Sequence, residues 1–229
     1  MFNSVTSSFL SIDLEHLDDI IAINRNLPRD KQVMMFSATM NEQMRVCAKR
    51  FMDIPLEVII GDDTKLTLHG LQQFYVDVKE KEKLRQCYHL LTTIDYNQTI
   101  IFVSTINRCN ALEDVLAKLK QDVIKIHGAM QQGERLFNYN AFKACKKRVL
   151  VVTKMFDRGI DFERVNLVIN YDFPEDSDTY LHAVGRAGRF GTKGVAVSFV
   201  GCPADDDTRR EVQKRFDITL ELMPEKIVI

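Results

Sequence analysis

Short apolar runs that alternate with amphipathic stretches are the sequence feature that most restricts the fold. Residues 99–103 are apolar or β-branched throughout, as in a strand buried on both faces of a sheet. Strands that alternate with helices need crossover connections, so the sequence predicts an α/β fold whose parallel sheet is covered by helices on both faces. Further strands are predicted at 123–126, 149–152, 165–169 and 195–200, and helices around Cys109–Leu119, around Leu136, Tyr139 and Phe142, and at 176–184.

The first 62 residues differ from the rest of the chain. They contain too few predicted elements to close a parallel sheet, whereas the alternation from residue 72 onward is that of a complete domain. A polar segment separates the two parts and is typical of a linker. We therefore predict a domain remnant at 1–62 (strands 32–36 and 56–60, helix 41–51), a linker at 63–71 and an α/β domain at 72–229.

Composition excludes several classes of protein. The 229 residues include 31 basic and 32 acidic side chains, so the formal charge of -1 excludes a polybasic protein, and any nucleic-acid site must be a local patch. The five cysteines are scattered without metal-binding spacing, which indicates a reducing compartment and no metal site. We expect no membrane association, because no apolar run approaches the ~20 residues of a spanning helix.

Residues that follow the predicted strands are the candidates for a site, because ligands of open α/β sheets bind at the carboxyl ends of the strands. Hydroxyl groups, an arginine and a glycine that permits close backbone approach suit phosphate oxygens. Each residue alone is better explained as a helix cap or a turn, whereas the set together favours phosphate binding. The set comprises Ser104, Thr105, His127, Gly128, Gln132, Arg135 and Thr153.

Residues 182–189 carry the strongest local signal. His182 and Arg186 are expected on one helix face, and Gly188 ends the helix so that Arg189 lies beside Arg186. Two adjacent guanidinium groups suit a triphosphate near its transition state. The alternative is a basic helix end with a glycine cap, which explains one arginine but not the repeated pattern. Glycines that leave the backbone open to close approach stand at 185, 188, 191 and 194.

Asp161 follows Arg158 and Gly159 at the same predicted edge. Its carboxylate suits the hydroxyl groups of a ribose, and an ion pair with Arg158 or Arg164 explains it equally well.

The sequence contains no G-x-x-x-x-G-K-[ST] segment and no acidic D-E-x-D box. It therefore has arginines suited to a triphosphate without the loop that holds the β- and γ-phosphates. This combination indicates one half of a composite site.

Several segments together resemble the C-terminal half of the DEAD-box RNA helicases, over about residues 31–201. As a set these segments are highly specific. Residues 66–73 and 174–180 are also similar to the branch of the family that acts in mRNA splicing and export. The matching segments are 37–39 (motif III), 100–105 (motif IV), 132–135 (the Q-x-x-R element), 153 with 158–161 (motif V) and 182–189 (motif VI).

The resemblance implies two RecA-like domains that close on ATP with Mg²⁺ and on single-stranded RNA or a short RNA duplex. Residues 1–62 would be the tail of the first domain, and the Mg²⁺ ligands would lie in the part of that domain that is missing from this chain. The implied roles are catalysis for Arg186, Arg189 and His182; ATP binding for Asp161, Gly159 and the same two arginines; RNA binding for Thr105, Gly128, Arg135 and Thr153; and coupling for Ser37 and Thr39.

Two residues depart from the family pattern, and both bear on the coupling to ATP. Ala183 stands where the family usually has arginine, which removes a charge expected to face the other domain. Asp157 replaces a small residue and places an anion near the phosphate-binding edge.

By resemblance, then, the chain is expected to be the C-terminal half of a nuclear ATP-dependent RNA helicase, with mRNA splicing and export proteins as partners. The chain alone is expected to bind RNA weakly and not to turn over ATP. The alternative is a non-catalytic, helicase-derived module that binds RNA or protein.

Overall fold

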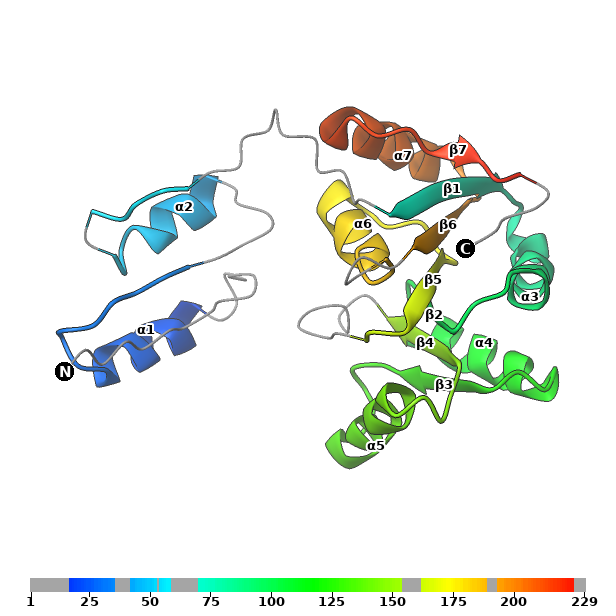
Figure 1. The fold of residues 1–229 in the computed structure, drawn as a ribbon, viewed down its shortest axis with the longest axis horizontal. Coiled ribbons are helices and arrows are strands. Elements are labelled where there is room, and N and C mark those ends of the chain that lie inside the picture. Colours follow the sequence, from blue (N-terminus) through cyan, green and yellow to red (C-terminus); the bar gives the residue numbers. More distant parts are fainter. Residues whose placement is uncertain are drawn as a thin grey trace. The chain divides into compact units, whose positions relative to one another are not determined.

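A seven-stranded parallel sheet with the order β3-β4-β2-β5-β6-β1-β7 organises the second of two compact units, residues 64–229 (Figure 1). The computed structural model describes residues 17–35, 42–52, 54–58, 70–153, 162–188 and 193–224. The strands are β1 (Leu71–Asp77), β2 (Gln98–Val103), β3 (Val123–Ile126), β4 (Val149–Thr153), β5 (Val165–Asn170), β6 (Gly194–Val200) and β7 (Glu221–Leu222).

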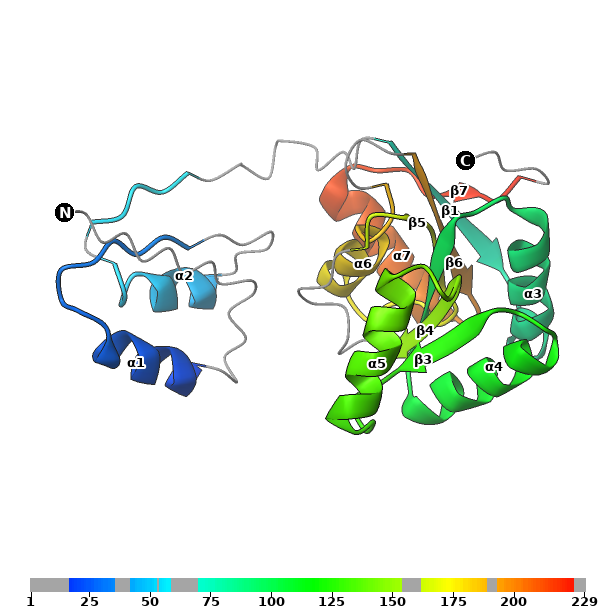
Figure 2. The same cartoon turned by 60° about the horizontal axis from the view of Figure 1, so that its bottom comes forward.

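Helices cover both faces of this sheet, as the sequence predicted (Figures 1 and 2). On one face, α3 and α4 pack against alternate strand residues such as Ile101 and Val103. On the other, α5, α6 and α7 pack against the intervening residues, among them Ile100 and Phe102. The helices are α3 (Lys83–Thr93), α4 (Ile106–Lys118), α5 (Gln132–Lys143), α6 (Ser177–Val184) and α7 (Pro203–Phe216), with a short 3-10 helix η2 (Glu80–Glu82) before α3.

Local hydrogen bonds fix where the helices begin. The Thr105 hydroxyl accepts from the Arg108 amide and caps α4, and Asp176 accepts from the Thr179 amide and caps α6. At the start of α7, Pro203 occupies the first turn and Asp205 accepts from the backbone amides of residues 201 and 202. Each cap stands just after a strand or its turn, so the chain reverses direction within a few residues.

Gln98 forms hydrogen bonds with backbone carbonyl groups near the end of α5. Its buried amide nitrogen donates to the carbonyl oxygens of Phe142 and Lys147, both at 2.8 Å. The pairing of β2 with β5 shifts register between Gln98 and Thr99, which leaves the Gln98 side chain directed to this task.

The first unit, residues 1–63, contains the described helices α1 (Leu17–Asn26) and α2 (Glu42–Ala48). The strands predicted at 32–36 and 56–60 are not found, because the described residues 31–35 and 55–58 adopt no strand conformation. A strand forms only when a neighbour pairs with its backbone, and the described sheet pairings all lie in the second unit. The assignment of residues 1–62 to a first RecA-like domain stays a prediction. Residues 61–69 lie outside the described part, and β1 begins at Leu71, inside the predicted linker.

The residues that α5 buries differ in part from the prediction. Phe142 is fully buried and packs edge-to-face on Phe162, with ring centroids 4.8 Å apart. Leu136 was predicted on the same face but is 58% exposed. The buried residue of this helix is Phe142 and the half-buried ones are Arg135, Asn138, Tyr139 and Ala141, so the covered stripe passes beside Leu136 rather than through it.

We expect Phe142→Ala to lower the free energy of unfolding by about 3–5 kcal/mol, because it leaves a cavity under α5. Leu136→Ala on the same helix should change it by less than about 0.5 kcal/mol. Urea unfolding followed by circular dichroism measures both. Equal losses in the two variants would show that the face of α5 is assigned wrongly.

Candidate functional site

The carboxyl ends of four adjacent strands form one edge of the sheet. Val103 of β2 pairs with Thr153 of β4 and Phe102 with Asn170 of β5, while Ile126 of β3 pairs with Val152. Residues that follow these strands therefore lie together along that edge. The register places the strand ends that precede Thr105 and Gly128 beside the end of β4, which carries Thr153. Arg135 lies in the first turn of α5, the helix that follows β3. The role of these residues in binding stays a prediction.

Thr105 stands exposed at the start of α4. Its hydroxyl oxygen accepts from the Arg108 amide at 3.3 Å, and a hydroxyl that accepts one hydrogen bond still has a proton to donate. The N-terminus of α4 adds a partial positive charge. This combination suits an anionic oxygen.

Nothing in the described residues requires glycine at position 128. A Cβ built there would meet no atom of the described chain within 4 Å, and its φ is not in the left-handed region. Its neighbour His127 is anchored: Nε2 lies 3.2 Å from Asn110 Oδ1, and its amide donates to the Met130 sulfur. Burial and the charge of Lys125 lower the pKa of His127, so it is neutral at pH 7. The loop thus holds an open backbone position where a ligand can approach closely.

Asp172, two residues after β5, joins four segments at the same edge. Its Oδ2 accepts from the amide and hydroxyl of Ser104 at 2.8 and 2.9 Å. Its Oδ1 lies 3.1 Å from Lys83 Nζ and 2.8 Å from Arg108 Nη2. Lys83 is nearly fully buried, and both cations lie over the ring of Tyr171 at 5.7 and 5.4 Å from its centroid. We call Asp172, Ser104, Lys83 and Arg108 the Asp172 cluster.

The charges in the Asp172 cluster stabilise its ionised form. Burial alone raises the pKa of Asp172, but the hydrogen bonds from Ser104 and the charge of Lys83 outweigh burial and bring the pKa below its ordinary value. Two cations thus share one buried carboxylate. The exposed Glu80 supplies a second carboxylate, 3.2 Å from Lys83 and 2.6 Å from Arg108.

The sequence analysis did not single out Asp172, Lys83 or Arg108. For Asp172 a signal was present, because it follows a buried strand at the edge where the other candidates were sought. For Lys83 there was none, since a lysine in a charged stretch is normally solvated. Its burial depends on α3 packing beside β5, which the local pattern does not encode.

The exit of α6 differs from the prediction. The helix ends at Val184, and Arg186 lies in the following turn, where its amide donates to the Ala183 carbonyl at 3.1 Å. Its Nε donates to the His182 carbonyl, also at 3.1 Å, so the two residues meet through the backbone rather than as neighbours on a helix face. The half-buried guanidinium of Arg186 is thereby tethered at the end of α6.

Internal packing explains Gly188 and Gly194 without a ligand. Gly188 has a φ of 71°, which favours glycine. A Cβ on Gly194 would lie 2.5 Å from the Gly188 nitrogen, so the two backbones can pack only without a side chain. Internal packing thus accounts for both glycines, and the prediction that they open the backbone to a ligand stays a prediction.

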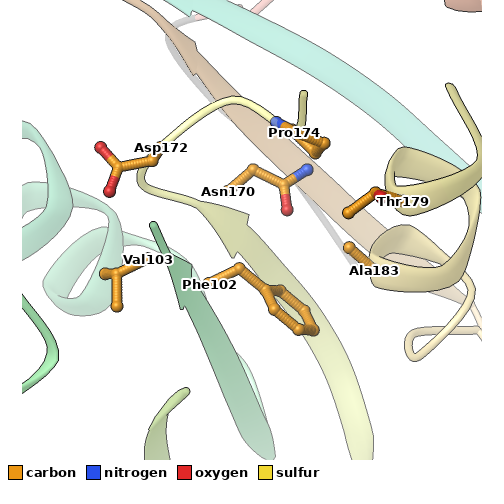
Figure 3. A pocket seen from close by; sticks show the side chains of 7 residues that line it. All are labelled: Phe102, Val103, Asn170, Asp172, Pro174, Thr179 and Ala183. Carbon is orange, nitrogen blue, oxygen red and sulfur yellow. The ribbon is translucent and has the colours of Figure 1, made fainter. Parts of the chain in front are cut away.

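Ala183 lines a small pocket inside the unit rather than an outward face (Figure 3). It is 2% exposed and lies near Thr179, Pro174 and Asn170. Figure 3 shows Asn170 pointing toward this side and Asp172 pointing to the other. The buried Asn170 amide donates to Ser198 at 2.9 Å, while its oxygen has no hydrogen-bond partner within the described part of the chain. A larger residue at 183 would therefore meet the interior of this domain first.

The remaining candidates lie outside the described residues: Ser37, Thr39, Asp157, Gly159, Asp161 and Arg189. Within the described ranges, no group of His, Cys, Asp or Glu side chains is arranged to hold a metal ion. Among the helices that the structure describes, none has the length and apolar character needed to cross a membrane.

Comparison with known proteins shows which family and which relatives this chain resembles. Residues 82–191 match the helicase conserved C-terminal domain. The chain is 52% identical over 217 residues to the ATP-dependent RNA helicase WM6 of Drosophila melanogaster, covering 93% of this chain and 51% of the relative. It is 50% identical over 219 residues to DDX39A of Homo sapiens, an ATP-dependent RNA helicase, covering 94% and 51%. The chain thus spans about half the length of these relatives.

Solved structures agree with the predicted RecA-like α/β fold. S. cerevisiae Dbp5 bound to RNA and ADP BeF3 matches with a TM-score of 0.82 at 32% identity, covering 95% of this chain and 59% of that chain. The C-terminal domain of the DEAD-box protein Dbp5 matches with a TM-score of 0.64 at 34% identity, covering 69% and 92%.

We expect Asp172→Asn to lower the free energy of unfolding by about 3–5 kcal/mol at pH 7, because it leaves the buried Lys83 and the half-buried Arg108 with only the exposed carboxylate of Glu80. The folded pKa lies below the unfolded value of about 3.9, so the contribution of Asp172 is fully present above that pH and is lost as the pH falls through the folded value. Denaturant unfolding of wild type and variant across this range measures the difference.

Asp122→Asn is the matched control. Asp122 pairs with Lys147 at 2.7 Å but is 48% exposed, so its loss should amount to less than about 1 kcal/mol. A loss of similar size in both variants would show that the Asp172 cluster is an ordinary surface pair.

Proposed function

The chain belongs to the DEAD-box family of RNA helicases, and from this premise we propose that the carboxyl edge of its second unit binds the phosphate backbone of single-stranded RNA or of a short RNA duplex. The observation that carries the proposal is the register of β3, β4 and β2, which aligns Gly128, Thr153 and Thr105 on neighbouring strand ends. Gly128 offers an open backbone and Thr105 an exposed hydroxyl at the N-terminus of a helix, while Thr153 adds a hydroxyl at the end of β4 that is 8% exposed.

Contacts of this kind do not distinguish one RNA sequence from another. Backbone amides, hydroxyl groups and Arg135 recognise phosphate and sugar, which are the same for every nucleotide. The near-neutral net charge fits this proposal, because binding then depends on a few placed groups rather than on a basic surface.

The ATP site is proposed on the other side of the same edge, at the exit of α6. Of the residues implied by the resemblance, Arg186 is described at this exit, where its Nε donates to the His182 carbonyl. A guanidinium group can bind phosphate oxygens through parallel hydrogen bonds. Arg186 and Arg189 would hold the terminal phosphates, with Asp161 and Gly159 at the ribose side. Bound ATP with Mg²⁺ would supply the phosphoanhydride bond and the neutralising metal.

Hydrolysis and unwinding are proposals for the longer protein that the relatives represent. Within these 229 residues there is no P-loop and no acidic box, so the residues that would hold Mg²⁺ are not among them. We propose that this chain supplies the arginines and part of the RNA path, and that ATP turnover needs a complete first domain.

A nuclear location and partners in mRNA splicing and export are proposed from the two similar stretches at 66–73 and 174–180. The competing function is a non-catalytic module that binds RNA or protein. The same absence of a P-loop favours it.

We expect Arg135→Ala to weaken binding of single-stranded RNA by a similar factor for oligouridylate and oligoadenylate, because a phosphate contact carries no base information. The slope of log K against log salt should become shallower by about 0.7, the value for one phosphate on a single strand. Lys118→Ala removes an equal charge at the far end of α4, at the opposite edge of the sheet, and should change neither quantity. Fluorescence anisotropy at several salt concentrations measures both.

We expect the purified 229-residue chain to release no phosphate from ATP above background, with or without RNA, since it lacks the loop that holds the β- and γ-phosphates. A phosphate-release assay tests this directly. RNA-stimulated release that Arg186→Ala abolishes would contradict the proposal that turnover needs a complete first domain.

A further inference from the structure

Glu80 lies as an exposed carboxylate between two cations of the Asp172 cluster. Its Oε2 is 3.2 Å from Lys83 Nζ and its Oε1 is 2.6 Å from Arg108 Nη2, yet its side chain is 64% exposed. Solvent screens the attraction of a carboxylate that is largely exposed, even where its cationic partners are not. Glu80 therefore occupies a place between Lys83 and Arg108 that it can leave at small cost.

The charges of the Asp172 cluster explain why a carboxylate stands at position 80. Both oxygens of Asp172 are already engaged, Oδ2 by Ser104 and Oδ1 by Lys83 and Arg108. One negative charge faces two positive charges, so the cluster by itself carries a net positive charge directed at Glu80. The Arg108 side chain is 31% exposed, and its buried Nε has no hydrogen-bond partner within the described residues.

This net positive charge lies beside the proposed RNA path. Arg108 is in the first turn of α4, three residues after Thr105, which caps that helix. An oxyanion held by Arg108 and Lys83 would therefore share the N-terminal end of α4 with an oxyanion held by the Thr105 hydroxyl.

We propose that Lys83 and Arg108 form a further oxyanion site, which takes a phosphate group of the bound RNA strand, and that Glu80 occupies this site when RNA is absent. The inference rests on the proposed RNA binding and extends its path by one phosphate. A guanidinium binds phosphate oxygens through two parallel hydrogen bonds, and Lys83 adds a point charge held in place by Asp172. Glu80 is thus an internal competitor that lowers the affinity for RNA.

The test compares Glu80→Gln with Glu82→Gln in the intact 229-residue chain. Both residues lie in η2, both substitutions remove one negative charge, and Glu82 is likewise exposed. Removal of the competitor should raise the affinity for a labelled single-stranded oligouridylate about two- to fivefold in Glu80→Gln, the range expected for an exposed pair, and leave it nearly unchanged in Glu82→Gln. Fluorescence anisotropy gives the affinities, and thermal unfolding verifies that the variants fold.

A double variant tests whether the gain passes through Arg108. In an Arg108→Gln background, Glu80→Gln should give no gain, because the oxyanion site is already lost. A gain that persists there, or an equal gain from Glu82→Gln, would show a general charge effect and overturn the oxyanion site. If the wild-type chain binds no RNA at all, the proposed function fails; if it binds RNA and the two single variants behave alike, only this inference fails.

Inorganic phosphate distinguishes the source of the oxyanion. Thermal unfolding of Glu80→Gln in phosphate and in chloride at equal ionic strength reports on a free ion. A gain in RNA affinity supports a backbone phosphate as the occupant. Stabilisation by phosphate without any gain in RNA affinity would overturn RNA as the occupant.

Discussion

The carboxylate of Asp172 is the constraint on which the carboxyl edge of the sheet depends. It joins the end of β5, the turn between β2 and α4, the start of α3 and the first turn of α4 through bonds to Ser104, Lys83 and Arg108. A buried lysine is costly unless it is paired, so α3 and β5 are held together by charge as well as by apolar packing. The bonds from Ser104 to Asp172 thereby hold the turn that contains Thr105 against the end of β5.

The two faces of the sheet carry different groups at this edge. On the side of α3 and α4, the Asp172 cluster is polar and charged, and the exposed carboxylate of Glu80 balances its second cation. On the side of α6, Asn170 and Ala183 line a small pocket, and Arg186 is tethered where that helix ends. Because adjacent strands end in register, the groups on both sides of this edge are supported by the same sheet.

Sequence reasoning predicted the parallel sheet because its strands are apolar on both faces and alternate with helical periods. It located Thr105, Gly128 and Thr153 because the carboxyl-edge rule needs only the order of the elements. It failed where long-range packing decides: Leu136 has helical spacing but faces solvent, Gly194 is glycine because Gly188 packs on it, and Lys83 is buried because Asp172 lies opposite. The described residues of the strands expected at 32–36 and 56–60 adopt no strand conformation, and strand pairing likewise depends on neighbours.

The central claim is that RNA meets this chain at the carboxyl edge of the sheet. Backbone amide chemical shifts of the labelled chain, titrated with a single-stranded oligouridylate, test it most directly. The account predicts perturbations at Ser104, Thr105, Gly128 and Thr153, and none at the amino ends of the same strands, at Gln98, Val123 and Val149. Perturbations centred on the amino ends or on α7, or none under saturating RNA, would contradict it.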